Sequence, residues 1–143
     1  MHIVDILAAK GSEVATIRRD ATVSEAVAEL SRRSIGALVV SADGAHIEGI
    51  VSERDIVRRL DRLGADLLGT FVASIMSAPV HTCAPEDTPD EVMATMTNRR
   101  VRHMPVARDG VLCGLVSIGD VVKSRIEALE ADHKELVEYI TAR

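Results

Sequence analysis

The sequence predicts an α+β fold made of two α/β-type repeats, with small sheets flanked by helices, followed by a long C-terminal helix. Landmarks of the first half return in the second, 66 residues apart for Thr22 and Thr88 and 65 residues apart for Ser52 and Ser117. Segments with apolar residues at helical spacing alternate with short continuous apolar runs, which are typical of buried strands. A unit of about 65 residues is marginally stable alone, so we expect the repeats to pack together about a pseudo-two-fold axis.

The first repeat is predicted to cover residues 1–63. Thr22 precedes a segment with apolar residues at helical spacing and is expected to cap that helix. Asp43-Gly44 is a turn signal between two strands. The predicted elements, in order, are a helix at 4–9, a strand at 13–17, a helix at 23–31, a buried strand at 35–40, a strand at 47–51 and a helix that stops near Gly64.

Residues 64–71 are predicted to link this unit to the second repeat, residues 72–124, which has the same order of elements. Pro89 falls at the first position of a helix capped by Thr88, a place where proline is tolerated. Asp109-Gly110 corresponds to the turn of the first repeat. The predicted elements are a helix at 72–76, a strand at 80–83, a helix from 89, a strand at 103–106 and a strand at 112–116.

Composition limits the class of function. Only 1% of the 143 residues are aromatic and the net charge is −5, which argues against a nucleic-acid partner. No apolar run is long enough to cross a bilayer and the N-terminus lacks the features of a signal peptide, so we expect a cytoplasmic protein with no membrane partner. Cys83 and Cys113 are predicted to be buried free thiols, and the histidines show no metal-binding spacing.

The most informative motif occurs twice, as Gly49-Ile50-Val51-Ser52-Glu53-Arg54-Asp55 and as Gly114-Leu115-Val116-Ser117-Ile118-Gly119-Asp120. Each copy places a serine at the end of a strand and an aspartate in the first turn of the next helix. One interpretation is a variant capping box with a purely structural role. The other is a sugar site, in which the carboxylate accepts hydrogen bonds from a ribose diol and the helix N-terminus favours a phosphate.

Residues 125–143 are predicted to extend the last helix. Its apolar positions step by four and three residues, which is the spacing of a coiled-coil seam: Val122, Ile126, Leu129, His133, Leu136 and Ile140. Two interpretations stay open. The helix lies on its own domain, or it pairs with a partner helix in a dimer.

Together these motifs resemble a tandem cystathionine-beta-synthase (CBS) domain pair, also called a Bateman module, and more narrowly the stand-alone bacterial CBS-domain proteins. The resemblance covers nearly the whole chain. It rests on both corner motifs, on Thr22-Val23-Ser24-Glu25-Ala26, on Asp5-Ile6-Leu7 with its counterpart Ser74-Ile75-Met76, and on Arg102-His103-Met104-Pro105-Val106.

The resemblance implies an adenine-nucleotide ligand, such as AMP, ADP, ATP or NAD(H), in a cleft between the repeats. It implies that the corner residues hold the ribose, that the first strands lie beside the adenine, that apolar residues sandwich the base and that basic residues meet the phosphate. The ligand-binding residues expected on this basis are Thr16, Ile35, Ser52, Arg54, Asp55, Val80, Thr82, Arg102, His103, Met104, Pro105, Ser117 and Asp120.

The two sites are expected to be unequal. Arg99, Arg100, Arg102 and His103 form the densest positive patch of the chain, although the first two also suit the C-terminal end of a helix. The equivalent place in the first repeat is the uncharged stretch 34–38, so Arg32 and Arg33 on the preceding helix would have to substitute. Which repeat supplies the phosphate contacts to which corner is left open.

The leading functional hypothesis is a regulatory sensor that binds an adenine nucleotide, acts as a homodimer and signals occupancy to an unknown regulated protein. The main alternative is a ligand-free structural dimerisation module whose corners are only helix caps. An enzyme is a weaker alternative, because no phosphate-binding loop, nucleophile motif or metal-ligand pair is present. We therefore expect neither catalytic residues nor a catalytic cofactor.

Overall fold

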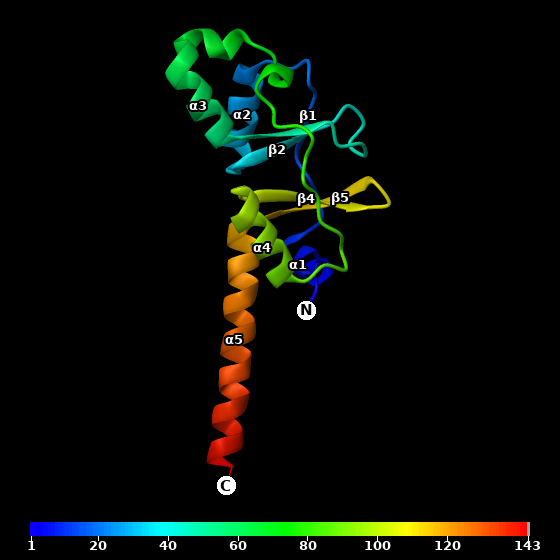
Figure 1. Cartoon of the computed structure of the whole chain (residues 1–143), viewed down its shortest axis with the longest axis vertical. Helices are drawn as coiled ribbons and strands as arrows, with labels where there is room; N and C mark the ends of the chain where they lie inside the picture. The colour runs from blue at the N-terminus through cyan, green and yellow to red at the C-terminus, as the bar shows by residue number, and fades with distance from the viewer. Residues whose placement is uncertain (143) are drawn as a thin grey trace.

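The computed structural model describes residues 1–142, which form two stacked α+β units and a long helix that projects from the second unit (Figure 1). The predicted fold class is confirmed, with two repeats, small sheets flanked by helices and a long C-terminal helix. Both sheets lie toward the middle of the stack (Figure 1). The helices α2 (Val23–Arg33) and α3 (Glu53–Leu63) lie above them, and α1 (Ile3–Lys10) and α4 (Pro89–Arg99) lie below.

The first unit contains a three-stranded sheet in the order β1-β2-β3. Strand β1 (Thr16–Ile17) runs parallel to β2 (Ala37–Val40), which pairs antiparallel with β3 (Gly49–Ser52). All four residues of β2 are buried, as its continuous apolar run predicts. Helix α2 (Val23–Arg33) packs on this sheet through Val23, Ala26 and Leu30, whereas α3 (Glu53–Leu63) has no buried residue.

The second unit contains a two-stranded antiparallel sheet of β4 (His103–Arg108) and β5 (Val111–Ser117). Asp109 and Gly110 join the strands with φ angles of 52° and 78°, as a tight hairpin turn with two left-handed residues requires. Helix α4 (Pro89–Arg99) begins after Thr88, whose side chain accepts a hydrogen bond from the Glu91 amide, and Pro89 occupies its first turn as predicted.

Two predicted elements of the second repeat are wrong in detail. The segment 72–76 is not an α-helix: after η1 (Gly64–Gly69), the chain makes only a short 3-10 turn, η2 (Val72–Ser74). It leaves the helical path because both backbone groups of Ser77 bond to Ile50 of β3. The predicted strand at 80–83 is reduced to one bridge between Cys83 and Val106, because the flanking Pro79 and Pro85 have no amide hydrogen to donate.

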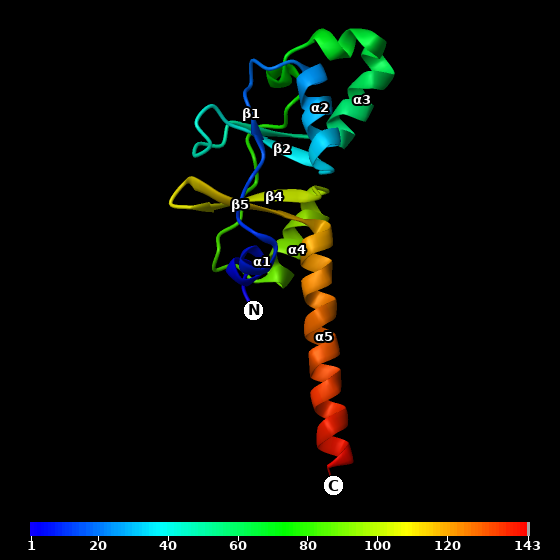
Figure 2. The ribbon, with the colours of Figure 1, turned by 180° about the vertical axis from the view of Figure 1, so that it is seen from behind.

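The hydrophobic cores are crossed, meaning that each unit's core includes residues from a segment next to the other unit in sequence. Helix α1 (Ile3–Lys10) contributes Ile3, Ile6 and Leu7 to the core of the second unit, together with residues of α4, β4, β5 and the start of the last helix. Figure 2 shows α1 below the β4–β5 sheet. In return, the segment between the repeats contributes Leu67, Val72 and Ile75 to the core of the first unit. Each unit is therefore completed by residues that precede the other in sequence.

This crossing explains the glycine that opens each corner motif. A Cβ atom on Gly49 would lie 2.6 Å from the sulfur of Met76, and a Cβ atom on Gly114 would lie 2.6 Å from Cδ1 of Leu7. Both distances are shorter than side-chain atoms tolerate. The two glycines leave room for the exchanged segment to pack against the strand, so they have a packing role in addition to any role in the corner.

Helix α5 (Ile118–Thr141) has 24 residues, of which only Val121 and Ser124 are buried. Beyond its first two turns it runs away from the rest of the molecule (Figures 1 and 2). The interpretation that this helix lies on its own domain is therefore wrong for most of its length, because within residues 1–142 the helix projects away from the two units and Ala131 to Ile140 are all exposed.

Candidate functional site

Both corners form capping boxes. The hydroxyl of Ser52 accepts a hydrogen bond from the Asp55 amide at 3.3 Å, and the carboxylate Oδ2 of Asp55 accepts one from the Ser52 amide at 2.8 Å. Ser117 and Asp120 repeat this pattern at 3.2 and 2.9 Å. Each aspartate uses Oδ2 for the cap, and no described hydrogen bond within residues 1–142 occupies the other carboxylate oxygen. Capping therefore leaves an acceptor available at both corners.

The first corner opens into a cavity of about 300 Å³, which we call the arginine cavity. Ser52, Asp55 and two arginines of α3 line one side of it. Residues from the end of α4 and the start of β4 line the other side, so both repeats contribute. The lining includes five arginines and one histidine: Arg54, Arg58, Arg99, Arg100, Arg102 and His103.

None of these five arginines lies within ion-pair distance of a carboxylate in residues 1–142. Glu53 and Asp55 are the acidic residues of the lining, and neither closes an ion pair with the arginines. An excess of positive charge in a cavity raises the local concentration of anions. Arginine also presents paired N–H donors that match the geometry of a phosphate. The cavity is thus suited to a phosphorylated ligand.

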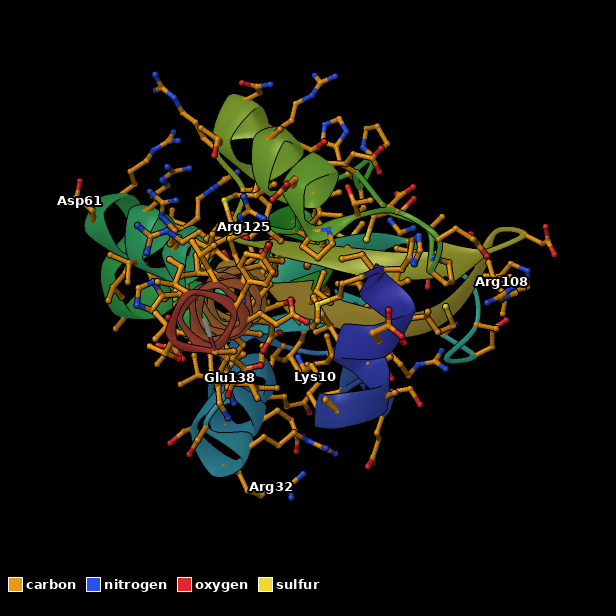
Figure 3. The ribbon with its side chains drawn as sticks, turned by 90° about the horizontal axis from the view of Figure 1, so that it is seen from below. Lys10, Arg32, Asp61, Arg108, Arg125 and Glu138 are labelled. Carbon is orange, nitrogen blue, oxygen red and sulfur yellow. The ribbon has the colours of Figure 1, made fainter. Side chains whose placement is uncertain are left out.

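The second corner borders another cavity, of about 550 Å³, which we call the lysine cavity. Ser117 and Leu115 line it from the second repeat, and the loop after α2 lines it from the first repeat with Ser34, Ile35 and Gly36. Asp120 is not part of this lining, because its carboxylate is turned toward Lys10. The side chain of Lys10 reaches from α1 toward α5 (Figure 3).

The cations of the lysine cavity are already paired. Lys10 Nζ lies 2.6 Å from Asp120 Oδ2 and also donates to the Leu115 carbonyl at 3.0 Å. Arg33 lies 2.9 Å from Glu29, which Arg32 also contacts. Burial acts to raise the pKa of Asp120, but the hydrogen bonds from Lys10 and Ser117 outweigh it and hold that pKa below its usual range. Asp120 is therefore a charged carboxylate that is already paired with Lys10.

His103 stands between the two cavities and lines both. Its imidazole lies against Gly36, where a Cβ atom would be only 3.2 Å from the ring, so glycine at this position makes room for the histidine. Burial lowers the pKa of His103, and it outweighs the carboxylates of Glu53 and Asp120, which act in the opposite direction. The ring is therefore neutral at pH 7 and can still donate one hydrogen bond.

The structure brings together only part of the predicted set. Ser52, Arg54, Asp55 and Arg102 meet at the arginine cavity, Ile35 and Ser117 line the lysine cavity, and His103 joins the two. Thr16, Val80, Thr82 and Pro105 line neither of them. Met104 is expected to sandwich a base, and the structure corrects this expectation. Its side chain is 2% exposed and packs in the core, because alternate residues of β4 face the helices.

Sequence reasoning missed residues that line the cavities. Arg58 follows Arg54 by one helical turn, so its place on the same face could have been read from the spacing. Arg99 and Arg100 suit the C-terminal end of a helix, and they also line the arginine cavity. No local signal pointed to Lys10, which reaches Asp120 across 110 residues of sequence.

Comparison with known proteins places this geometry in a family. The CBS domain family matches residues 5–62 and 72–127, one match for each repeat. The chain therefore belongs to the CBS domain family, as a tandem pair. Each matched range contains one of the two corner motifs.

A relative from Arabidopsis thaliana, the mitochondrial CBS domain-containing protein CBSX3, is 35% identical over 127 residues, which is 86% of this chain and 60% of that protein. The crystal structure of the CBS-domain containing protein ATU1752 from Agrobacterium tumefaciens is 39% identical, with a TM-score of 0.84 over 87% of this chain and 99% of that one. A hexameric CBS-CP12 protein from bloom-forming cyanobacteria is 26% identical, with a TM-score of 0.75 over 95% of this chain and 86% of that one.

Two further findings concern residues 1–142. No helix within this range is long and apolar enough to cross a membrane. No group of three or more histidine, cysteine, aspartate or glutamate side chains in the same range is arranged to hold a metal ion. Cys83 and Cys113 are free thiols, the first buried and the second half-buried, and burial raises the pKa of Cys83 to about 12.

Proposed function

We propose that the protein is a regulatory module that binds an adenine nucleotide in the arginine cavity and signals its occupancy to a partner protein. The observation that supports this proposal is the set of five arginines around the Ser52–Asp55 corner, none of which has a carboxylate partner in residues 1–142. We infer an adenine base from the family resemblance, and we infer an anionic group on the ligand from the positive charge of the arginines.

Each end of such a ligand has a chemical partner in the cavity. The free oxygen of the Asp55 carboxylate accepts hydrogen bonds from ribose hydroxyls, while its Oδ2 keeps capping α3. The positive end of α3 and the arginines favour the phosphates. Several arginines suit a ligand with more than one phosphate, such as ADP, ATP or NAD(H), and AMP would engage only some of them.

The signal would be a shift between orientations of the two repeats. Asp55 and Arg54 come from the first repeat, whereas Arg100 and Arg102 come from the second. A nucleotide that bridges them binds the orientation in which both sets reach it, and it stabilises that orientation by the difference in affinity. The family relative from cyanobacteria is hexameric, and we infer that this chain also acts as an oligomer, with a homodimer as the basic unit.

The most direct experiment compares melting temperatures with AMP, ADP, ATP and NAD(H). A ligand that binds only the folded state adds about 2.7 kcal/mol of stability at about 100 times its dissociation constant, which raises the melting temperature by several degrees. Asp55→Asn should abolish this shift, and Asp120→Asn is the control at the other corner. If none of these nucleotides raises the melting temperature at millimolar concentration, the nucleotide proposal is wrong.

The same experiment tests the alternative of a ligand-free structural module. The complete capping boxes at both corners favour that alternative, since they explain both motifs without a ligand. If both asparagine variants lose stability and no nucleotide changes the melting curve of the wild type, the structural module is the better description.

A further inference from the structure

The outer part of α5 projects away from the two units in the single chain (Figures 1 and 2). Every residue from Ala131 to Ile140 is exposed, and the family match ends at residue 127. The structure from Agrobacterium tumefaciens is matched over 99% of its length yet covers 87% of this chain, so this chain is the longer of the two. Helices in proteins draw most of their stability from packing an apolar face rather than from propensity, so another surface would stabilise this extension.

Most of the exposed apolar side chains of α5 form one continuous seam, which Val137 and Tyr139 flank. Five of its six members are apolar and 39–61% exposed: Val122, Ile126, Leu129, Leu136 and Ile140, with His133 as the sixth. Their steps of four and three residues match a heptad repeat in which Ile126, His133 and Ile140 occupy a positions, and Val122, Leu129 and Leu136 occupy d positions. Isoleucine at a with leucine at d favours two-stranded parallel coiled coils, and a single polar a residue fixes the register.

The flanking charges select the direction of pairing. In a parallel pair, Arg125 at a g position faces Glu130 of the partner subunit at an e position, and two-fold symmetry makes this attraction twice. In an antiparallel pair with the same layers, Glu130 would face its own copy and Asp132 would face its own copy, so like charges would meet. Arg125 lies 3.6 Å from Asp90 in the single chain, a long contact between half-exposed side chains that can be exchanged.

We propose that α5 pairs with α5 of a second copy of this chain in a parallel two-stranded coiled coil over residues 122–140. A membrane surface fits less well, because residues 122–142 contain three basic and five acidic side chains, whereas surface-bound helices are rich in lysine and arginine. The proposal is independent of nucleotide binding. It places both modules at the same end of the coiled coil.

Disulfide trapping tests this arrangement even if other surfaces also join the modules. Leu129→Cys puts a thiol at a d position, where identical residues of a parallel pair are neighbours. Ala131→Cys, on the outer face of the same helix, is the matched control. Under mild oxidation we expect most of the Leu129→Cys protein, and little of the Ala131→Cys or wild-type protein, to migrate as a disulfide-linked dimer.

Equal cross-linking of the two variants overturns the proposal. So does cross-linking that requires cysteine at both Leu129 and His133, because those positions face each other only in the antiparallel arrangement.

A second measurement tests the coiled coil even if the two thiols at position 129 are not placed to form a disulfide. Leu129→Glu combined with Leu136→Glu should lower helical circular dichroism and remove its dependence on protein concentration, whereas Ala131→Glu should change neither. Binding of the wild type, but not the seam variant, to phosphatidylserine vesicles without self-association would assign the seam to a membrane instead.

Discussion

The two corners of this CBS pair share a motif and a cap geometry, yet they face cavities in different electrostatic states. At the arginine cavity, five arginines surround Ser52 and Asp55 without a carboxylate partner in residues 1–142. At the lysine cavity, Lys10 is paired with Asp120 and Arg33 is paired with Glu29. A repeated motif therefore does not imply two equal sites, since the pairing of the surrounding charges differs.

The difference has an energetic meaning for an anionic ligand. In the arginine cavity a phosphate relieves repulsion between cations that have no other partner. In the lysine cavity the same phosphate must compete with Glu29 for Arg33, and a ribose must compete with Lys10 for Asp120. The expectation that the sites are unequal thus becomes a specific one, in which the arginine cavity is the stronger site.

The largest expected effect is on affinity at the arginine cavity. Arg102→Ala removes a charge-assisted hydrogen bond to phosphate, a contribution of about 1.5–3 kcal/mol, and should weaken nucleotide binding about 10- to 100-fold by titration calorimetry. Arg33→Ala is the control at the lysine cavity and should change affinity little. Comparable losses in both variants would contradict the comparison.

A smaller effect is expected on the stability of the free protein. Asp55→Ala and Asp120→Ala each remove one hydrogen bond of a capping box and should each lower the free energy of unfolding by about 1 kcal/mol in urea titrations. Asp120→Ala also breaks the contact with Lys10, so its loss should be the larger one. Only Asp55→Ala should also abolish the response to nucleotide. A larger loss for Asp55→Ala would mean that the Lys10 contact contributes nothing.

Removing the Lys10–Asp120 ion pair at the lysine cavity should have a weaker effect on nucleotide binding. Lys10→Ala frees the Asp120 carboxylate, and a second, weak binding event should become measurable at high nucleotide concentration. The gain should be about fivefold or less, because ion pairs of partly exposed side chains contribute about 1 kcal/mol or less. A titration that still fits one site at all concentrations would show that Lys10 is not what distinguishes the cavities.

The smallest effect is a dependence of stability on pH. Because burial lowers the pKa of His103 in the folded protein, its neutral form contributes stability that is present above the unfolded pKa of about 6.5. This stability should be lost as the pH falls below that value toward the folded pKa. His103→Gln should flatten this part of the profile in urea titrations at a series of pH values. An unchanged profile in the variant would assign the effect to other groups.

The sequence predicted best what is decided locally. Thr22 and Thr88 cap the helices that follow them, as predicted, because a cap involves residues only three apart. The buried strand at 37–40 and the turn at Asp109-Gly110 are similarly encoded within a few residues. The order of elements and the two repeats followed from these local signals.

Contacts between distant residues escaped prediction. Nothing near Lys10 indicates that it will meet Asp120, and nothing near Met104 indicates which face of β4 lies toward the helices. The arginines at the end of α4 looked sufficient as helix-end cations, so their place in a cavity with Asp55 needed the packing of the two repeats. The missing information was the relative position of the halves.

The crossed cores also bear on how the chain folds during its synthesis. Ile3, Ile6 and Leu7 are translated long before the strand that they pack against, which ends at Ser117. They must wait until most of the chain has been translated, while the first unit needs only the residues up to Met76. The first unit can therefore fold early during synthesis. Helix α1 can pack in its final position only after the second unit has been translated.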